Sequence, residues 1–373
     1  MQKYSFIYTP ATEPAAWLRS LWILGSKAWE NVYLAVFAPK VFREMAELLS
    51  PLLIGKSLED IEKLKNDLII ATGYWSLRGA ARHVISAFEI AMIDGLAKTR
   101  EIPVYELLGG RNYPVQIYGS GGDSLDTGSM EAELKYLRDL NISLFKIRAR
   151  KDDMEKAVWT INKAKECRIN IAIDMTQNLS NPGQSVKDVL NFENSIFRQT
   201  GKLPVFLEEA LGIDHLNDYP ELKMRGVSKI AGGEIVTTEA ELIEKIKKGY
   251  YHIVQPDATV IGGVSSVMKI FEAASEHNVE TVVHCWGGAV GMMANYHTAI
   301  AGKGSLVEWP MPHFPLRDEM VIEPWAIDSG YLQLPQSPGL GVRLTTAIEE
   351  RYPFREDAVY RCLVSDHTTS WHK

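Results

Sequence analysis

Acidic and basic residues recur at regular intervals along the second half of the chain, each near the end of a short β-branched segment. In chain order they are Lys146 with Arg148, Asp174, Glu208 with Glu209, Glu234, Asp257, His284 and Glu308. A single carboxylate after a strand is usually a helix cap or a solvated charge. Seven such segments in succession indicate instead that these side chains gather in one active site.

Three of these residues have the chemistry of a metal site. Asp174, Glu208 and Glu234 come from three successive segments and offer only oxygen donors, which favours Mg²⁺ or Mn²⁺ over Zn²⁺. Carboxylates held close together without a cation repel one another, which raises their pKa. Glu208 is the predicted ligand of its pair, because strand alternation turns Glu209 the other way.

The elements that position these residues follow a strand–helix alternation. Amphipathic helical patterns such as 154–166, 237–249 and 264–278 separate the β-branched segments. Eight such segments within residues 115–319 predict an α/β fold, a closed (β/α)₈ barrel with the polar residues at one end. The predicted strands are 115–120, 144–149, 170–175, 205–210, 229–234, 252–257, 281–286 and 305–309.

The regions before and after the predicted barrel have different sequence patterns from it. Residues 1–114 hold an irregular start and then long helical patterns over 42–55 and 83–110, both of which stop at glycine. Residues 320–373 are Pro- and Gly-rich in their first half, and we expect them to pack back on the N-terminal region. The chain therefore divides into residues 1–114, a barrel over 115–319 and a C-terminal segment over 320–373.

Composition excludes several classes of protein. The chain has 373 residues with 40 Lys and Arg against 47 Asp and Glu, so its net charge of −7 argues against binding to nucleic acid or anionic membranes. Three scattered cysteines do not make a disulfide framework or a cysteine zinc site. No apolar run is long enough for a membrane span, so we expect a cytoplasmic protein.

Several segments resemble the enolase superfamily and, within it, the mandelate racemase subgroup. Two further segments are similar to the helix of the family's capping domain and to its C-terminal strap, namely 87–110 and 337–342. The segments that carry the site resemblance are FKIR (145–148), FLEEAL (206–211), AGGE (231–234), QPDATVIGG (255–263), HCWGG (284–288) and VEWP (307–310).

The resemblance implies an N-terminal α+β capping domain over a modified (β/α)₈ TIM barrel, closed by the C-terminal tail. It implies that Asp174, Glu208 and Glu234 bind Mg²⁺, with Mn²⁺ as the alternative, beside a small carboxylate substrate. It further implies abstraction of the proton α to that carboxylate through an enediolate whose charge the metal stabilises. We also expect a homo-oligomer.

Roles for the remaining residues follow from this chemistry. His284 is the predicted base, because its reference pKa lies near the operating pH, and Asp257 would orient it. Lys146 would support the substrate carboxylate, and Glu308 would face the developing enolate oxygen in its protonated form. Trp286 and the segment Thr9–Ser26 are candidates for substrate specificity.

Arg148 stands where many members of the family have a second lysine. Neutralising a guanidinium at pH 7 costs about 7 kcal/mol, so Arg148 is a poor base and more suited to hold a substrate carboxylate or hydroxyl. A single base on the His284 side favours dehydration of a sugar acid, an aldonate or aldarate, to a 2-keto-3-deoxy acid. The predicted enzyme is then a hydro-lyase of sugar-acid catabolism. The alternatives are a racemase, epimerase or lactone cycloisomerase, and a catalytically silent binding barrel.

Overall fold

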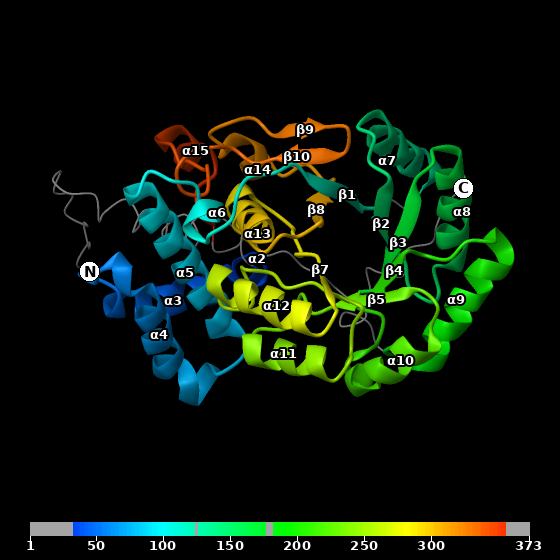
Figure 1. The fold of residues 1–373 in the computed structure, drawn as a ribbon, viewed down its shortest axis with the longest axis horizontal. Coiled ribbons are helices and arrows are strands. Elements are labelled where there is room, and N and C mark those ends of the chain that lie inside the picture. The colour runs from blue at the N-terminus through cyan, green and yellow to red at the C-terminus, as the bar shows by residue number, and fades with distance from the viewer. Residues whose placement is uncertain (1–32, 124–125, 177–181, 356–373) are drawn as a thin grey trace.

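The computed structural model describes residues 33–123, 126–176 and 182–355 and shows eight parallel strands surrounded by helices (Figure 1). The polar residues predicted to form the site lie within β2 to β8 or up to three residues after these strands end. The strands are β1 (Val115–Gly121), β2 (Leu144–Arg148), β3 (Asn170–Asp174), β4 (Phe206–Glu208), β5 (Lys229–Gly232), β6 (Ile253–Val254), β7 (Glu280–Thr281) and β8 (Leu306–Pro310).

Strand pairing curls this sheet round on itself. Strands β1 to β7 pair in chain order, all parallel, and β8 returns to pair with β1 from Gln116↔Leu306 to Ser120↔Pro310. Parallel neighbours require crossovers, and the intervening helices supply them. The predicted α/β barrel fold is therefore confirmed.

Helices cover the outer face of the sheet, as Figure 1 shows for α7 to α12. Their ends carry ordinary capping chemistry: Ser185 and Asp188 form a capping box at α9, which ends at Gly201 in the left-handed conformation. The helices are α7 (Thr127–Asp139), α8 (Met154–Glu166), α9 (Val186–Thr200), α10 (Tyr219–Arg225), α11 (Glu239–Lys247), α12 (Val264–Glu276), α13 (Ala289–Ala301) and α14 (Pro315–Glu319).

The region before the barrel is helical wherever it is described. No strand occurs between residues 33 and 114, and residues 1–32 lie outside the described part of the chain, so the α+β character of this domain stays a prediction. The elements are α2 (Tyr33–Phe37), α3 (Pro39–Leu49), α4 (Ile61–Ser76), α5 (Ala80–Thr99) and α6 (Val104–Leu107), with short 3₁₀ turns at Ser50–Leu52 and Leu58–Asp60.

Two predicted helices are shorter than their sequence patterns. The pattern over 42–55 ends as an α-helix at Leu49, because Pro51 has no N–H to continue the ladder. The pattern over 83–110 is interrupted between Thr99 and Val104, where Glu101 adopts a positive φ and Pro103 precedes α6. Proline thus overrides an otherwise continuous apolar periodicity.

The C-terminal segment joins both parts of the molecule. Strands β9 (Ala326–Asp328) and β10 (Tyr331–Gln333) form a hairpin whose second strand pairs antiparallel with β1. Further on, Val104 N donates to Gly339 O at 2.9 Å, and Leu340 N donates to an Asp94 carboxylate oxygen at 2.8 Å. Helix α15 (Thr346–Arg351) follows, and residues 356–373 lie outside the described part. These contacts support our proposal that residues 320–373 pack back on the capping domain.

A cluster of apolar side chains fills the inside of the barrel and forms the floor beneath the polar strand ends. It is separate from the main core, which lies between the strands and the outer helices. The barrel is therefore a packed core and not a pore. The cluster consists of Tyr118, Ala172, Phe206, Ala231, Ile253 and Val282.

None of the helices in the described part of the chain combines the length and the apolar character needed to cross a membrane.

Candidate active site

The strand ends bring the predicted site residues to one end of the barrel. Register pairs Arg148 with Asp174, and Asp174 with Glu208, across three neighbouring strands. The residues Lys146, Asp174 and Glu208 are each at most 4 % exposed. Parallel register explains this grouping, because the carboxyl ends of all the barrel strands open on one face.

Lys146 links the two sides of the site. Its Nζ lies 2.5 Å from Glu208 Oε1 and 2.7 Å from Glu308 Oε1, and it stands 5.7 Å from the ring centre of Tyr118. Burial lowers the pKa of Lys146, but Glu208 and Glu308 outweigh burial and hold this pKa well above its usual value. The ammonium group is therefore charged and lies between the carboxylates of Glu208 and Glu308.

The adjacent carboxylates Glu208 and Glu209 point in different directions, although Glu209 already lies beyond the end of β4 and has a positive φ of 43°. Glu208 faces Lys146, whereas Glu209 accepts a hydrogen bond from Gly233 N at 2.7 Å. A Cβ at Gly232 would lie 2.9 Å from the Tyr251 ring and 3.0 Å from Glu209 Oε1, so this position requires glycine. Glu209 thus binds the backbone that follows β5, whereas Glu208 faces Lys146.

His284 lies between two carboxylates. Its Nδ1 is 2.9 Å from Asp257 Oδ2, and its Nε2 is 3.3 Å from Glu234 Oε2. Burial lowers the pKa of His284, but Glu234, Glu308 and Asp257 outweigh burial and raise it to about 10. Asp257 therefore orients one ring nitrogen, and the other faces the predicted metal ligand.

Sequence reasoning missed two amides that hold these carboxylates. Gln255 Nε2 donates to Glu208 Oε2 at 2.6 Å, and Asn295 Nδ2 donates to Asp257 Oδ1 at 2.9 Å. Gln255 belongs to the same QPD segment as Asp257, two residues before it, so inward strand alternation was a usable signal. Asn295 comes from the middle of α13, and nothing in the sequence pattern marks it.

Arg148 is placed at the rim of the site by three neighbours. It forms an ion pair with Asp123, its Nε lies 3.5 Å from Asp174 Oδ2, and its guanidinium stands 4.4 Å from the Trp286 ring centre. Trp286 in turn contacts the Phe314 ring edge-on. The stacked guanidinium suits recognition of oxygen groups and not proton abstraction.

The charge state of Glu308 differs from the protonated form that was predicted. Burial opposes its ionisation, but Lys146 and His284 outweigh burial and lower the pKa of Glu308 to about 2. Its Oε2 accepts a hydrogen bond from Cys285 N at 2.8 Å. The expectation of a protonated Glu308 is therefore wrong for this arrangement, because Lys146 supplies a direct ionic partner.

The carboxylates that face the barrel mouth have the character of a cation site. Burial raises the pKa of Glu208 to about 8 and that of Glu234 to about 7, so these groups lack sufficient positive charge around them. Gln255 Oε1, beside Glu208, is buried without a hydrogen-bond partner in the described part of the chain. Oxygen donors that lack a positively charged partner suit a hard divalent ion such as Mg²⁺.

The side chains as they stand are turned toward protein cations instead. Glu208 faces Lys146 and Glu234 faces His284, and no trio of acidic, histidine or cysteine side chains in the described ranges is set out to hold a metal ion. The backbone therefore places the predicted ligands at the same end of the barrel, and all three residues are mostly shielded from solvent. Their side chains would have to rotate to share one ion.

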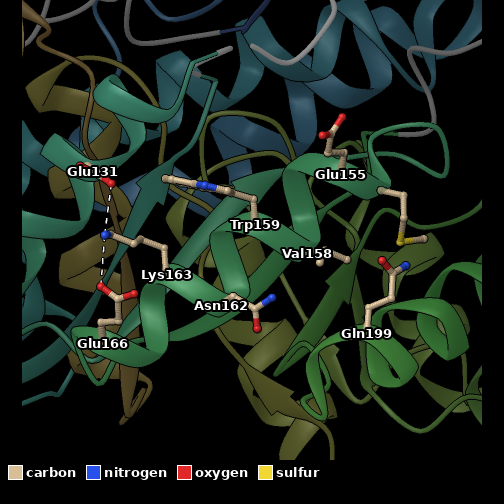
Figure 2. Close-up of a pocket in the computed structure, with 9 residues that line it drawn as sticks. Glu131, Glu155, Val158, Trp159, Asn162, Lys163, Glu166 and Gln199 are labelled. Atoms are coloured by element: carbon tan, nitrogen blue, oxygen red, sulfur yellow. Dashed lines mark ion pairs between the residues drawn. The ribbon is translucent and has the colours of Figure 1, made fainter. Parts of the chain in front are cut away.

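A separate cavity of about 710 Å³ lies on the outer face of the barrel, beside α8. Figure 2 shows Trp159 and Lys163 on this helix, with Lys163 placed between Glu131 and Glu166. None of the predicted site residues lines the cavity. The predicted specificity segment Thr9–Ser26 lies outside the described residues.

Comparison with known proteins gives a consistent picture. The sequence pattern of the family described as enolase C-terminal domain-like matches residues 129–348. An arabinonate dehydratase from Saccharolobus solfataricus is 29% identical over 315 residues, which cover 82% of each chain. An L-rhamnonate dehydratase from Saccharopolyspora erythraea is 28% identical, over 81% of this chain and 77% of the relative.

Solved structures agree on the fold. A 3,6-anhydro-D-galactonate cycloisomerase from Zobellia galactanivorans has a TM-score of 0.76 at 24% identity, covering 84% of this chain and 88% of that one. An L-talarate dehydratase from Polaromonas sp. JS666, complexed with Mg and L-glucarate, has a TM-score of 0.72 at 23% identity and covers 85% of both chains. At these identities the likeness establishes the architecture.

Proposed function

The chain belongs to the enolase C-terminal domain-like family, and we propose that it dehydrates a sugar acid, an aldonate or aldarate, to a 2-keto-3-deoxy acid. The observation that carries this proposal is the Asp257–His284 pair, joined at 2.9 Å beside buried carboxylates at the barrel mouth. Arabinonate, L-rhamnonate and D-galactonate dehydratases among the relatives support it.

The metal site belongs to the same proposal. Asp174, Glu208 and Glu234 would hold Mg²⁺, and solved neighbours with bound magnesium support this assignment. The ion would supply positive charge to the substrate carboxylate as negative charge develops on it. Lys146 would then be released from part of its pairing with Glu208 and become available to the same carboxylate.

His284 is the proposed base. When Glu234 serves as a ligand, His284 loses the partner that contributes most to raising its pKa, and this pKa falls toward the working pH. The imidazole then takes the proton from the carbon next to the carboxylate. Asp257 keeps the ring oriented and stabilises the imidazolium that forms.

Elimination completes the reaction. The bond to the hydroxyl group on the neighbouring carbon breaks, and the His284 imidazolium returns its proton to that group, so that water leaves. The resulting enol becomes the 2-keto-3-deoxy acid by tautomerisation. Arg148, stacked on Trp286, would hold an oxygen group of the substrate.

A panel of aldonic and aldaric acids with Mg²⁺ tests the proposal. A semicarbazide-reactive 2-keto product supports dehydration. Exchange of the α-proton in D₂O without a keto product indicates an isomerase instead, and a D-galactarolactone cycloisomerase is among the relatives. Absence of both reactions with every acid would favour a binding barrel.

A further inference from the structure

The first turns of α5 lie over the rim of the proposed site. Gly79 N, at the start of this helix, donates to Thr237 Oγ1 at 2.9 Å. About two turns further on, Ser86 Oγ accepts from Gly262 N at 2.8 Å. Both barrel partners belong to loops at the site: Thr237 follows Glu234 by three residues, and Gly262 follows the Asp257 turn.

His83 lies on α5 between these two anchors. The helix face that presents Ser86 to the barrel also presents His83, because residues three apart lie on one side of a helix. Its Nδ1 is buried and has no hydrogen-bond partner in the described part of the chain. A buried polar atom without a partner is unfavourable for the free protein, and its presence calls for an explanation such as an absent ligand.

The charge state of His83 indicates which ligand atom it suits. Burial lowers its pKa to about 4, although Asp257 acts in the opposite direction, so the imidazole is neutral near pH 7. A neutral imidazole offers one N–H and one lone pair. Both match a hydroxyl group, whereas a second carboxylate would call for a cation.

Cationic side chains at this boundary are already engaged by the protein. Lys65 Nζ donates to Ser265 Oγ at 2.9 Å and to Ser266 Oγ at 2.6 Å. Arg82 Nε donates to Leu77 O at 2.9 Å. The α5 side of this rim therefore offers hydroxyl recognition, because its cations Lys65 and Arg82 already bind protein groups.

We propose that His83 is a specificity-determining residue, which binds a hydroxyl group of the substrate beyond the reacting carbons. The inference rests on the proposed function and deepens it. A residue that only fills space at the α5–barrel boundary would affect all acids alike.

Three variants test the inference in the full-length protein with Mg²⁺. His83→Leu removes the polar atoms, His83→Asn keeps a polar group near the position of Nδ1, and His277→Leu is a matched control at an exposed site. The probes are six-carbon aldonates, the same acids deoxygenated at carbon 4, 5 or 6, and the matching aldarates. Turnover, calorimetric binding and Tm are measured for each protein.

We expect His83→Leu to raise KM and Kd for the preferred aldonate about tenfold, the loss of one hydrogen bond, with little change in kcat. One deoxy acid should be insensitive to the substitution, and His83→Asn should recover most of the affinity. The Tm of His83→Leu should equal or exceed that of the parent, because an unpaired buried atom is removed. His277→Leu should match the parent in KM, Kd and kcat.

Several outcomes would overturn the inference. An active parent with unchanged KM and Kd in His83→Leu removes His83 from substrate recognition and leaves the proposed function standing. A lower Tm with equal losses for every acid shows a structural role. A parent that neither binds nor converts any acid overturns both proposals.

Discussion

The carboxylate residues at the barrel mouth have too few positively charged partners. The carboxylates of Asp174, Glu208, Glu234, Asp257 and Glu308 outnumber the cationic side chains that face them. Burial makes this imbalance unfavourable, because a low-dielectric site penalises every unpaired charge. The arrangement therefore favours a bound cation and an anionic substrate that arrive together.

Replacement of His284 tests the proposed base. His284→Asn should reduce α-proton exchange in D₂O by at least about 100-fold, because the variant has no group that titrates in this position. Binding of Mg²⁺, measured by calorimetry, should stay nearly unchanged. His313→Asn, at a side chain that is 75% exposed, is the control. Persistent exchange in His284→Asn would show that another residue is the base.

Replacement of Glu234 tests the metal site. Glu234→Ala removes one of three charged ligands and should weaken Mg²⁺ binding by about 10- to 100-fold in a calorimetric titration. Glu244→Ala serves as the control, because that side chain is 58% exposed on α11. Unchanged affinity in Glu234→Ala would exclude this carboxylate from the site.

Among the elements, α5 and α12 depend on each other. Glu89 on α5 accepts hydrogen bonds from Val264 N and Ser265 N, both at 2.8 Å, and so caps the first turn of α12. A Cβ at Gly263 would lie 2.2 Å from Glu89, and φ there is +97°, so glycine is required for this approach. The junction fixes the capping helix against the loop that follows Asp257.

Removal of this cap should be costly. Glu89→Ala leaves two buried N–H groups without a partner and removes the carboxylate near Lys65, so the free energy of unfolding should fall by about 2 to 5 kcal/mol. Urea denaturation measures the loss. Glu62→Ala, at a side chain that is 70% exposed, should change stability by less than about 0.5 kcal/mol. A small effect of Glu89→Ala would show that water replaces the cap.

At the scale of the whole molecule, the barrel, the capping helices and the C-terminal segment meet around His297. This side chain of α13 accepts a hydrogen bond from Tyr105 N at 3.1 Å and stacks on the Tyr105 ring at 5.3 Å. Nearby, Gly339 and Leu340 bind α5 and α6. The three parts therefore form a continuous buried contact.

His297 makes the stability of this junction depend on pH. Burial lowers the pKa of His297 from an ordinary 6.5 to about 3. Below pH 6.5 this imidazole therefore binds a proton in the unfolded chain but stays neutral in the folded one. The contribution of neutral His297 to the free energy of unfolding is fully present above pH 6.5. It is lost as the pH falls toward 3, at about 1.4 kcal/mol per pH unit.

The variant His297→Asn keeps an acceptor for Tyr105 N but does not titrate. Its free energy of unfolding should therefore depend less steeply on pH between 6 and 4 than that of the parent, measured by urea denaturation at each pH. His313→Asn should keep the slope of the parent. Equal slopes for parent and His297→Asn would mean that His297 is charged in the folded protein.

The sequence by itself determined the order of elements and the residue types at the strand ends. Period-two alternation is a local property, so the inward direction of Glu208, the last residue of β4, followed from chain position alone. The same reasoning failed where proline or a positive φ interrupts a pattern, as between Thr99 and Val104.

Only the tertiary structure decided which side chains share their charge and hydrogen bonds. Asn295 reaches Asp257 from a helix 38 residues later, and Lys146 bridges Glu208 and Glu308, which lie on strands far apart in the chain. Helix α5 meets the loops at the barrel mouth through Gly79, just before its first residue, and through Ser86. Burial and pairing depend on distances across the fold, and one-dimensional spacing does not contain those distances.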